Sequence, residues 1–197
     1  MAMRIVVTEF MSLDGVVQAP GGPDEDTDGG FAHGGWSHPY FDVDVMGSVI
    51  MTGMANVDAL LFGRRTFEAM AGAWPDRAGD PYADQMNAVK KYVVSNTLDQ
   101  ADVLWNNSTV IPGAGAIQAI RELRSQEGRD LVIWGSASLA RAVITADLVD
   151  ELLVMIEPVT LGGGKRIFPE DGAARPWRLI SAVTAGTGVL VCQYQPA

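Results

Sequence analysis

The sequence predicts an α/β fold: a three-layer, mostly parallel mixed β-sheet that ends in an antiparallel hairpin. Over the first 150 residues, short apolar runs rich in β-branched residues alternate with segments of helical spacing. That alternation is the order in which a parallel sheet is built. From Asp150 onward, longer apolar runs are joined by glycine turns, which is typical of antiparallel strands. The 197 residues contain no repeat and no linker, so we expect a single domain over residues 1–197.

The front of the chain alternates in this way as far as residue 95. Its β-branched content predicts a buried strand at 4–11, and short apolar runs predict strands at 59–63 and 91–95. Apolar residues at helical spacing predict helices at 42–57, 64–70 and 82–88. Residues 18–40 are rich in Gly, Pro and Asp, as are residues 72–81 in Gly and Pro. The first of these loops is long, and loops of that length inside compact domains are usually functional or disordered.

The second half continues with shorter strands and then the hairpin. Short apolar runs predict strands at 102–105, 109–111, 130–135 and 151–161. Helices are expected at 114–126, with Ile117, Ile120 and Leu123 inward, and at 138–145. The glycine turn within 162–168 is expected to lead into a short strand. Residues 178–195 predict two strands joined around Gly186–Gly188.

Composition excludes several classes of protein. The 14 Lys and Arg against 24 Asp and Glu give a net charge of −10, which argues against binding nucleic acid or an anionic membrane. Cys192 is the only cysteine, so an intramolecular disulfide and a Cys-rich metal cluster are excluded. No apolar run reaches the ~18 residues of a membrane span, and the start lacks the pattern of a signal peptide. We expect a cytoplasmic protein in a reducing compartment.

Two predicted strand-to-helix junctions carry glycine, in LLFGRRTFE (60–68) and LVIWGSASLARAV (131–143). Each places free backbone N–H groups and the positive end of a helix dipole at the carboxyl end of a strand. Two such junctions suit the two phosphates of a pyrophosphate. Arg64 and Arg65 suit an additional phosphate, which favours NADP over NAD. The alternative is that Gly63 and Gly135 end their strands only because the chain must turn there.

Two other glycine-rich segments are weaker candidates for a phosphate site. TVIPGAGAIQAI (109–120) resembles a dinucleotide fingerprint, but Gln118 stands at the third glycine position and the acid expected about 20 residues on has no candidate at the end of a strand, since Asp130 begins one. Gly113 and Gly115 are therefore expected to start a helix. TLGGGKRIF (160–168) forms either a phosphate-binding nest or a sharp bend between two strands.

Reduction of a C=N or C=O bond requires a proton as well as a hydride, and carboxyl groups near apolar strand ends are candidates to supply it. Asp14, in SLDG, is either such a group or the start of an Asx turn with Gly15. Glu157, in an apolar strand, faces either solvent or a ligand. Asp44 and Asp58 bracket the helix predicted at 42–57, where they are also candidates for substrate contact.

The loop 18–40 carries groups that could hold a metal or a planar ligand. His33 and His38, with nearby Asp42 and Asp44, match no standard zinc spacing, so we expect no metal. Trp36 either caps a planar ligand or packs the loop down. Cys192 lies in a predicted strand and is expected to be a core residue. No Ser-His-Asp or Cys-His nucleophile set is recognisable.

Six motifs in sequence order carry a family resemblance over nearly the whole chain. They are SLDG (12–15), GGWSHPY (34–40), DALLFGRRTFE (58–68), KYVVSNTL (91–98), GSASLARAVI (135–144) and LVDELLVMIEPVTLGGGKRIFP (148–169). Together they resemble the dihydrofolate-reductase-like proteins that match the reductase domain of bacterial riboflavin-biosynthesis deaminase/reductases. The resemblance implies a dihydrofolate-reductase-like mixed sheet, a homodimer and NADPH as hydride donor to a small-molecule substrate.

The resemblance also implies roles for particular residues. The cofactor's phosphate region would be held by Gly63, Arg64, Arg65 and Thr66. The adenosine phosphate would lie near Ser95, Asn96 and Thr97. A second pyrophosphate contact would come from Gly135, Ser136, Ala137, Ser138 and Leu139. Asp14 and Glu157 would be the catalytic acids, with Trp36, Asp44 and Asp58 on the substrate side.

The sequence departs from the family's pattern in three places. These residues contain no deaminase domain with a zinc signature, so we do not expect the bifunctional riboflavin enzyme. True dihydrofolate reductases carry an acid within the helix after the first strand, whereas residues 43–57 have Asp44 only at their start. Asn96 stands where relatives often place Arg. We therefore expect an NADPH-dependent reductase related to dihydrofolate reductase and 5-amino-6-(5-phosphoribosylamino)uracil reductase. The alternative is a non-catalytic NADP-binding or regulatory dimer.

Overall fold

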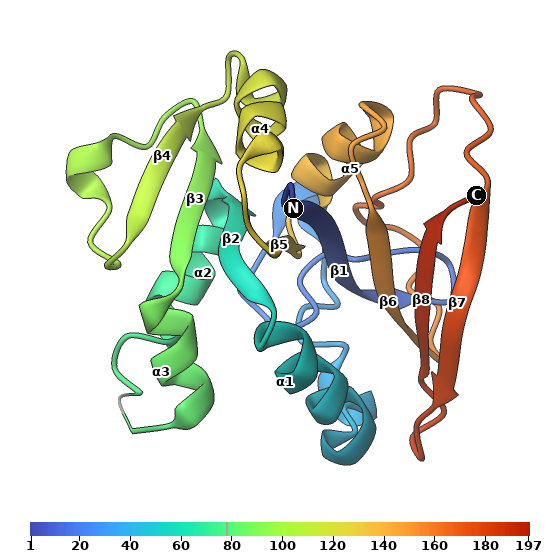
Figure 1. Cartoon of the computed structure of the whole chain (residues 1–197). Coiled ribbons are helices and arrows are strands. Elements are labelled where there is room, and N and C mark those ends of the chain that lie inside the picture. The colour runs from blue at the N-terminus through green and yellow to red at the C-terminus, as the bar shows by residue number, and fades with distance from the viewer. Residues whose placement is uncertain (78) are drawn as a thin grey trace.

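The structure, a computed structural model, describes residues 1–77 and 79–197. Its eight strands form one sheet in the order β4-β3-β2-β5-β1-β6-β8-β7, with β4 and β7 at the two edges and β1 near the middle (Figure 1). The strands are β1 (Arg4–Ser12), β2 (Val57–Gly63), β3 (Lys90–Ser95), β4 (Ser108–Pro112), β5 (Asp130–Trp134), β6 (Glu151–Glu157), β7 (Trp177–Thr184) and β8 (Leu190–Pro196). Neighbouring strands pair in parallel from β4 across β3, β2, β5 and β1 to β6. Strand β8 pairs antiparallel with both β6 and β7. This confirms the predicted fold class.

Helices cover both faces of the sheet and make three layers. The described α-helices are α1 (Ser48–Met54), α2 (Arg64–Ala73), α3 (Pro81–Ala88), α4 (Ala116–Ser125) and α5 (Ala137–Thr145). Side chains alternate between faces along β2: Ala59 and Leu61 pack with α4 and α5, whereas Leu60 and Phe62 pack with α1, α2 and α3. Burial of apolar surface on both faces is the main stabilising contribution to this architecture.

The strand predicted at 102–105 is wrong. The chain forms a short 3-10 turn at Gln100–Asp102 and then continues without sheet pairing. The apolar character of this stretch comes from Trp105, which is buried and stacks on Phe62 with ring centroids 6.3 Å apart. Its indole Nε1 donates to Asn87 Oδ1 at 2.7 Å. The apolar side chain of Trp105 therefore packs in the helix layer, and its backbone does not pair as a strand.

The short strand predicted within 162–168 is also wrong. The backbone there bonds to the segment that follows β1 and not to the sheet. Val17 N donates to the Lys165 carbonyl at 2.9 Å, and Lys165 N donates to Gln18 Oε1 at 3.1 Å. Ile167 is fully buried, which explains the apolar signal. Strand β6 ends at Glu157, before Pro158, because proline supplies no N–H to a sheet ladder.

The helix predicted at 42–57 begins with a π-helical turn, Val43–Gly47, and continues as α1. Asp42 caps this turn, since its Oδ1 accepts from Val45 N at 2.9 Å. Its other oxygen, Oδ2, accepts from Gly186 N at 3.0 Å in the hairpin between β7 and β8. The cap therefore fastens the start of the helix to the antiparallel end of the sheet.

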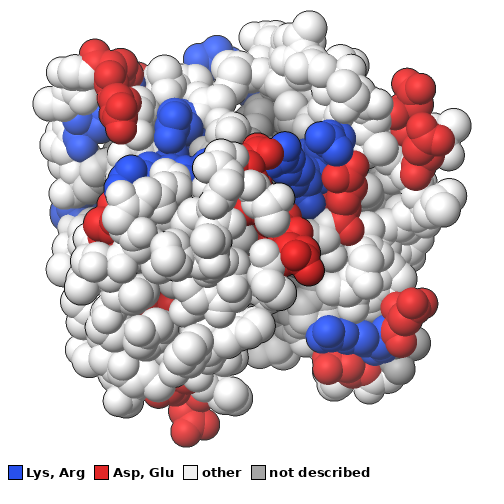
Figure 2. Space-filling model, turned by 180° about the vertical axis from the view of Figure 1, so that it is seen from behind, with Lys and Arg blue, Asp and Glu red and all other residues white. Residues whose placement is uncertain are grey.

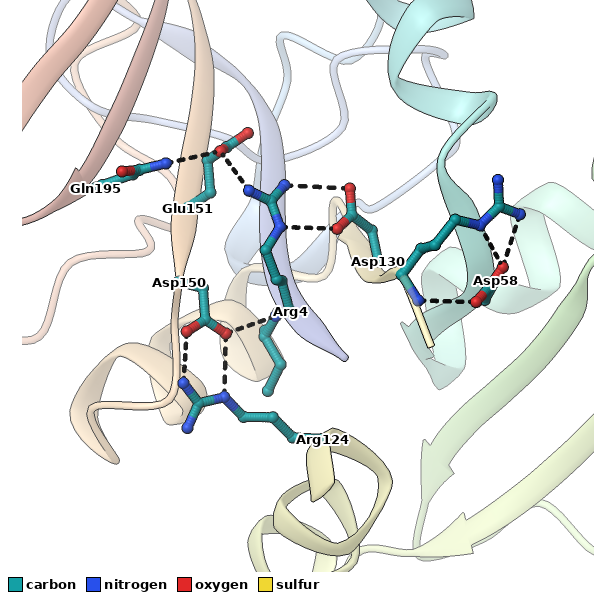
Figure 3. Close-up of polar contacts among 9 residues, drawn as sticks. Arg4, Asp58, Arg124, Asp130, Asp150, Glu151 and Gln195 are labelled. Carbon is teal, nitrogen blue, oxygen red and sulfur yellow. Dashed lines mark hydrogen bonds and ion pairs between the residues drawn. The ribbon is translucent and has the colours of Figure 1, made fainter. Parts of the chain in front are cut away.

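The amino ends of the central strands are joined by ion pairs (Figure 3). Arg4 on β1 contacts Asp130 on β5 at 2.9 Å and Glu151 on β6 at 3.4 Å. At the same end, Arg129 pairs with Asp58 of β2 at 2.7 Å. The charged side chains at the amino ends of these strands are therefore paired with one another within the protein. None of the described helices has the length and apolar character needed to cross a membrane.

Candidate cofactor and substrate pocket

A cavity of about 440 Å³ lies at the opposite, carboxyl end of the parallel strands. It is lined by Glu9 and Phe10 of β1, by residues 17–21, and by the β2–α2 and β5–α5 junctions, residues 63–66 and 134–139. Ligands in open α/β sheets bind at this end, because loops and helix N-termini converge there. The two junctions singled out in the sequence thus lie on one pocket.

A hydrogen bond joins the two junctions to each other. Gly63 N donates to Ser136 Oγ at 2.9 Å. Gly135 and Ser136 both have left-handed backbone conformations, with φ of 61° and 67°, and a Cβ on Gly135 would come within 3.3 Å of Thr66 Cγ2. A non-glycine residue in that conformation stores strain, which is common at ligand sites. The strained turn presents the N-terminus of α5 beside that of α2.

The N-termini of α2 and α5 carry no side-chain cap among the described residues. Their first backbone N–H groups therefore lack the partner that a capping side chain would supply. Such N–H groups, together with the helix dipole, are well suited to oxygen atoms of phosphate. The arrangement fits a pyrophosphate between the two helices.

The basic side chains around the pocket are paired with acids. Arg64 contacts Glu68 at 3.0 Å. Arg65 and Lys165 both contact Asp26 and Asp28, which lie in the loop that follows β1. The two cations lower the pKa of Asp28 to about 2. Seen from behind, the surface shows basic and acidic side chains next to each other (Figure 2).

Sequence reasoning missed two acids of the pocket, Glu9 and Glu25. The Glu9 side chain is 2% exposed, and its Oε1 has no hydrogen-bond partner within residues 1–77 and 79–197. Burial, and next the charge of Glu25, raise the pKa of Glu9 well above its usual range. Burial also raises the pKa of Glu25, while the N–H of Gly21, 2.7 Å away, acts against the shift. A single carboxyl group in the apolar run IVVTEFM was a signal that could have identified Glu9.

Glu157 is fully buried behind the pocket wall. Its Oε1 accepts from Ser37 Oγ at 2.6 Å, and Ser37 itself lines the cavity. Burial raises the pKa of Glu157 to about 7, and the hydrogen bond from Ser37 acts in the opposite direction. Trp36, next in the chain, is buried, and its indole Nε1 donates to the Gln18 carbonyl at 2.7 Å. Trp36 therefore packs the loop down.

Asp14 lies outside the cavity lining and fastens two turns together. Its carboxylate accepts from Ser12 Oγ at 2.6 Å and from the N–H groups of Leu161 and Gly162 at 3.0 and 2.8 Å. These bonds, that from Ser12 first, lower the pKa of Asp14 to about 2. An acid that is ionised at neutral pH has no proton to donate, so the structure does not support the expected role in catalysis.

The remaining predicted residues are not brought to the cavity. Asp58 pairs with Arg129 at the amino edge of the sheet, and Asp44 is exposed in the π-helical turn. Ser95 Oγ accepts from Thr97 N at 3.1 Å, so residues 95–97 form a closed turn at the end of β3 that is not among the lining residues. We therefore leave Asp44 and Asp58 out of the proposed site.

Comparison with known proteins identifies relatives. The family described as RibD C-terminal domain matches residues 3–191. The uncharacterized protein YyaP of Bacillus subtilis is 28% identical over 143 residues, 70% of this chain and 73% of YyaP. The structure of a putative riboflavin biosynthesis protein from Shewanella sp. PV-4 has a TM-score of 0.72 at 18% identity, covering 100% of this chain and 99% of that one.

A second solved structure is similar in fold. Dihydrofolate reductase from Enterococcus faecalis, complexed with NADP(H) and RAB-propyl, has a TM-score of 0.59 at 17% identity. The match covers 98% of this chain and 96% of that one.

Proposed function

Because the chain belongs to the RibD C-terminal domain family, we propose that it is an NADPH-dependent reductase acting on a small planar heterocycle, imine or carbonyl compound. The observation that carries this proposal is the pair of uncapped helix N-termini, joined through Gly63 N and Ser136 Oγ, on a cavity that also contains a buried acid. Such a site combines anion binding with a source of protons. We propose that it works within one domain, residues 1–197, in the cytoplasm.

The cofactor residues of this proposal are those of the two junctions. Gly63–Thr66 and Gly135–Leu139 would hold the pyrophosphate through backbone N–H groups, with Ser95, Asn96 and Thr97 toward the adenosine end. NADPH, when bound, supplies hydride. Arg64 and Arg65 would contact the additional phosphate, which requires Arg65 to leave Asp26 and Asp28. The protein's own contribution is to position the two reactants and exclude water.

The substrate side of the proposal is the part of the cavity lined by Phe10, Ser37, His38 and Phe41. The rings of Phe10 and Phe41 lie 6.4 Å apart, centroid to centroid, at 55°. Aromatic side chains with few polar groups suit a flat ring. Pteridines and ribosylaminopyrimidines are flat compounds of this kind and are the first candidates.

The proposed homodimer draws support from edge strand β7. Its Leu179, Ile180 and Val183 side chains are each at least 44% exposed, although apolar. Exposed apolar side chains on an edge strand are typical of a protein–protein contact. Sedimentation velocity would show a dimer if the proposal is right.

The proposal is tested first by binding and then by turnover. Calorimetric titration with NADPH should show binding at one site per chain. The loss of absorbance of the reduced nicotinamide should then follow addition of a pteridine, a ribosylaminopyrimidine or a simple carbonyl compound. Absence of NADPH binding would refute the proposal.

The second candidate function is a non-catalytic NADP-binding or regulatory dimer. It is favoured by the positions of Asp14 and Glu157, since neither expected catalytic acid lines the cavity. NADPH binding without oxidation by any compound of the panel would favour this alternative.

A further inference from the structure

We propose that Glu9 is the proton donor of this site, a buried carboxylic acid that gives its proton to the substrate atom beside the carbon that accepts hydride. The inference rests on the proposed reductase function and deepens it. It starts from the place of Glu9 in the sheet, then uses its burial, its partners and the charges around it.

Glu9 stands where β1 and β5 separate. The last parallel pair is Thr8 with Trp134, and Gly135 N donates to the Thr8 carbonyl at 3.2 Å. Beyond this point β5 turns into α5, while β1 continues beside β6. Glu9 is the first residue of β1 past the separation and lines the same cavity as Gly135 and Ser136. The carboxyl group thus lies next to one of the two proposed cofactor junctions.

The surroundings of Glu9 favour a neutral carboxyl group. Side chains alternate along β1, so Glu9 shares a face with Val7 and Met11, which are both buried in the apolar core. The side chain is only 2% exposed, and the described residues offer no hydrogen bond to Oε1. An ionised carboxylate without a partner is strongly disfavoured in such a place.

The charges that line the cavity point the same way. Besides Glu25, the titratable or charged lining residues are Asp26, Asp28, His38, Arg64, Arg65 and Lys165. The ion pairs that the described residues make with the three cations go to Glu68, Asp26 and Asp28, and none goes to Glu9. Burial raises the pKa of Glu25, and the hydrogen bond from the Gly21 N–H acts against that shift. Any negative charge on Glu25 opposes a second negative charge on Glu9.

The two acids expected from the sequence are placed less well for this role. Asp14 is ionised and lies outside the cavity. Glu157 is separated from the cavity by Ser37, to which it is bonded. Glu9 combines what they lack, since it lines the cavity and keeps its proton.

The step balances as follows. The substrate carbon of a C=N or C=O group accepts a hydride, with its two electrons, from reduced nicotinamide. The π electron pair moves to nitrogen or oxygen, which takes the proton of Glu9 and forms the new N–H or O–H bond. The products are the reduced substrate, oxidised nicotinamide and the Glu9 carboxylate. A proton from solvent restores the acid before the next turnover.

Three variants test the proposal in the intact chain. Glu9→Gln keeps the size of the side chain but removes the acidic proton. Glu25→Gln removes the neighbouring charge. Glu122→Gln, on the exposed side of α4, is the matched control, because Glu122 lies outside the cavity and its side chain hydrogen-bonds only to Gln118 among the described residues. Circular dichroism and calorimetric NADPH binding establish that each variant is folded and loads the cofactor.

The first readout needs no substrate. Infrared spectra of protein labelled with ¹³C at its glutamate carboxyl groups report protonated and ionised carboxyls separately. At pH 7, Glu9→Gln should lose a protonated-carboxyl band that Glu122→Gln keeps, and NADPH should shift this band in the wild-type protein. In Glu25→Gln the band should disappear at lower pH than in the wild type. Absence of a Glu9 band at pH 7, with NADPH bound, would overturn the inference and leave the proposed function standing.

The second readout is turnover with any panel compound that the wild-type protein reduces. General acid catalysis contributes about 10²- to 10⁴-fold, so kcat of Glu9→Gln should fall by at least ~100-fold. KM and the NADPH Kd should stay within about twofold, and the decline of kcat at high pH should vanish from the residual activity. A kcat within a few fold of wild type would overturn the inference. Where no compound is reduced, the infrared band and its shift decide. Absence of NADPH binding would refute the reductase itself.

Discussion

At the scale of single residues, Arg65 has one set of partners in the structure and another in the proposed cofactor complex. In the structure its guanidinium contacts the carboxylates of Asp26 and Asp28, which lie in the loop after β1. In the proposed complex it contacts a phosphate instead. Arg64, bonded to Glu68 on the exposed side of α2, has a weaker competitor, because exposed helix pairs contribute little. Asp26 and Asp28 thus pair with the Arg65 guanidinium that the proposed cofactor contact requires.

Replacing both arginines should discriminate between the two nicotinamide cofactors. Charge-assisted hydrogen bonds contribute about 1.5–3 kcal/mol, so Arg64→Ala with Arg65→Ala should raise the NADPH Kd by at least ~10-fold. The NADH Kd should change much less, since NADH lacks the additional phosphate. Calorimetric titration measures both. The double variant Arg121→Ala, Arg178→Ala removes the same charge from exposed positions outside the cavity and is the control. Equal losses for the two cofactors would place the arginines elsewhere.

The residue scale also shows why part of the site could be predicted. The junctions at Gly63 and Gly135 are local: a glycine and the start of a helix lie within a few residues of each other. The Glu9 and Glu25 pair is not local, because a separation of 16 residues is closed only when the loop folds back over the strand. The contacts of Asp14 are also not local. Its partners Leu161 and Gly162 are 147 and 148 residues away.

At the scale of elements, β3 contains a lysine, Lys91, at a position that is as buried as a core residue. Lys91 is fully buried, and its ammonium donates to the carbonyls of Asn87, Val89 and Asn106 at 3.1, 2.8 and 3.2 Å. It also lies 4.5 Å from the centroid of the Trp105 ring. Burial lowers the pKa of Lys91 to about 8. The ammonium therefore joins the α3–β3 connection to the segment that precedes β4.

Replacing Lys91 by methionine should destabilise the protein. The change leaves three carbonyls without a charged donor, and breaking such a buried arrangement costs about 2–4 kcal/mol. Lys90→Met, at the adjacent exposed position of the same strand, should change the free energy of unfolding by less than ~0.5 kcal/mol. Urea denaturation at pH 7 measures both values. If the two variants were equally stable, the Lys91 bonds would contribute nothing net.

Strands could be predicted from the sequence where an apolar run had a single cause, which is burial within the sheet. The apolar runs at β1, β2 and β5 are buried on both faces by helices, so their composition identifies them directly. Apolar residues had another cause at Trp105 and Ile167. There, side chains fill the core from segments whose backbone bonds elsewhere, so an apolar run predicted strands that do not form. An apolar composition therefore indicates that a segment is buried. Whether the backbone of that segment pairs in the sheet has to be inferred separately.

At the scale of the whole molecule, stability should depend on pH through two opposed sets of acids. Asp14, Asp28 and Asp171 have pKa values lowered to about 2, so the stability that they contribute is present above pH ~4 and is lost in strong acid. Glu157, with its pKa raised to about 7 from the ordinary 4.5, acts in reverse. Between these values the folded chain binds more protons than the unfolded chain. The free energy of unfolding therefore falls as pH rises through that window.

Glu157→Gln should remove part of this pH dependence. At pH 4 the variant should differ least from wild type, because Glu157 is then mostly protonated in both the folded and the unfolded chain. At pH 8 the variant should be the more stable of the two by up to ~3 kcal/mol, from about 1.4 kcal/mol per unit of pKa shift. Chemical denaturation across pH 4–8 measures the two curves, with Glu122→Gln as control. Parallel curves for Glu157→Gln and wild type would contradict the prediction.

The position of β1 in the sheet has a consequence for how the chain is made. β1 is the first strand to leave the ribosome, yet its partners on either side are β5 and β6, with Arg4 opposite Asp130 and Val6 opposite Glu151. Loop closure over such separations makes pairing slow. This strand of nine residues must therefore wait, unpaired, until β5, which begins at Asp130, has been synthesised. During that interval β1 is the segment most in need of a chaperone.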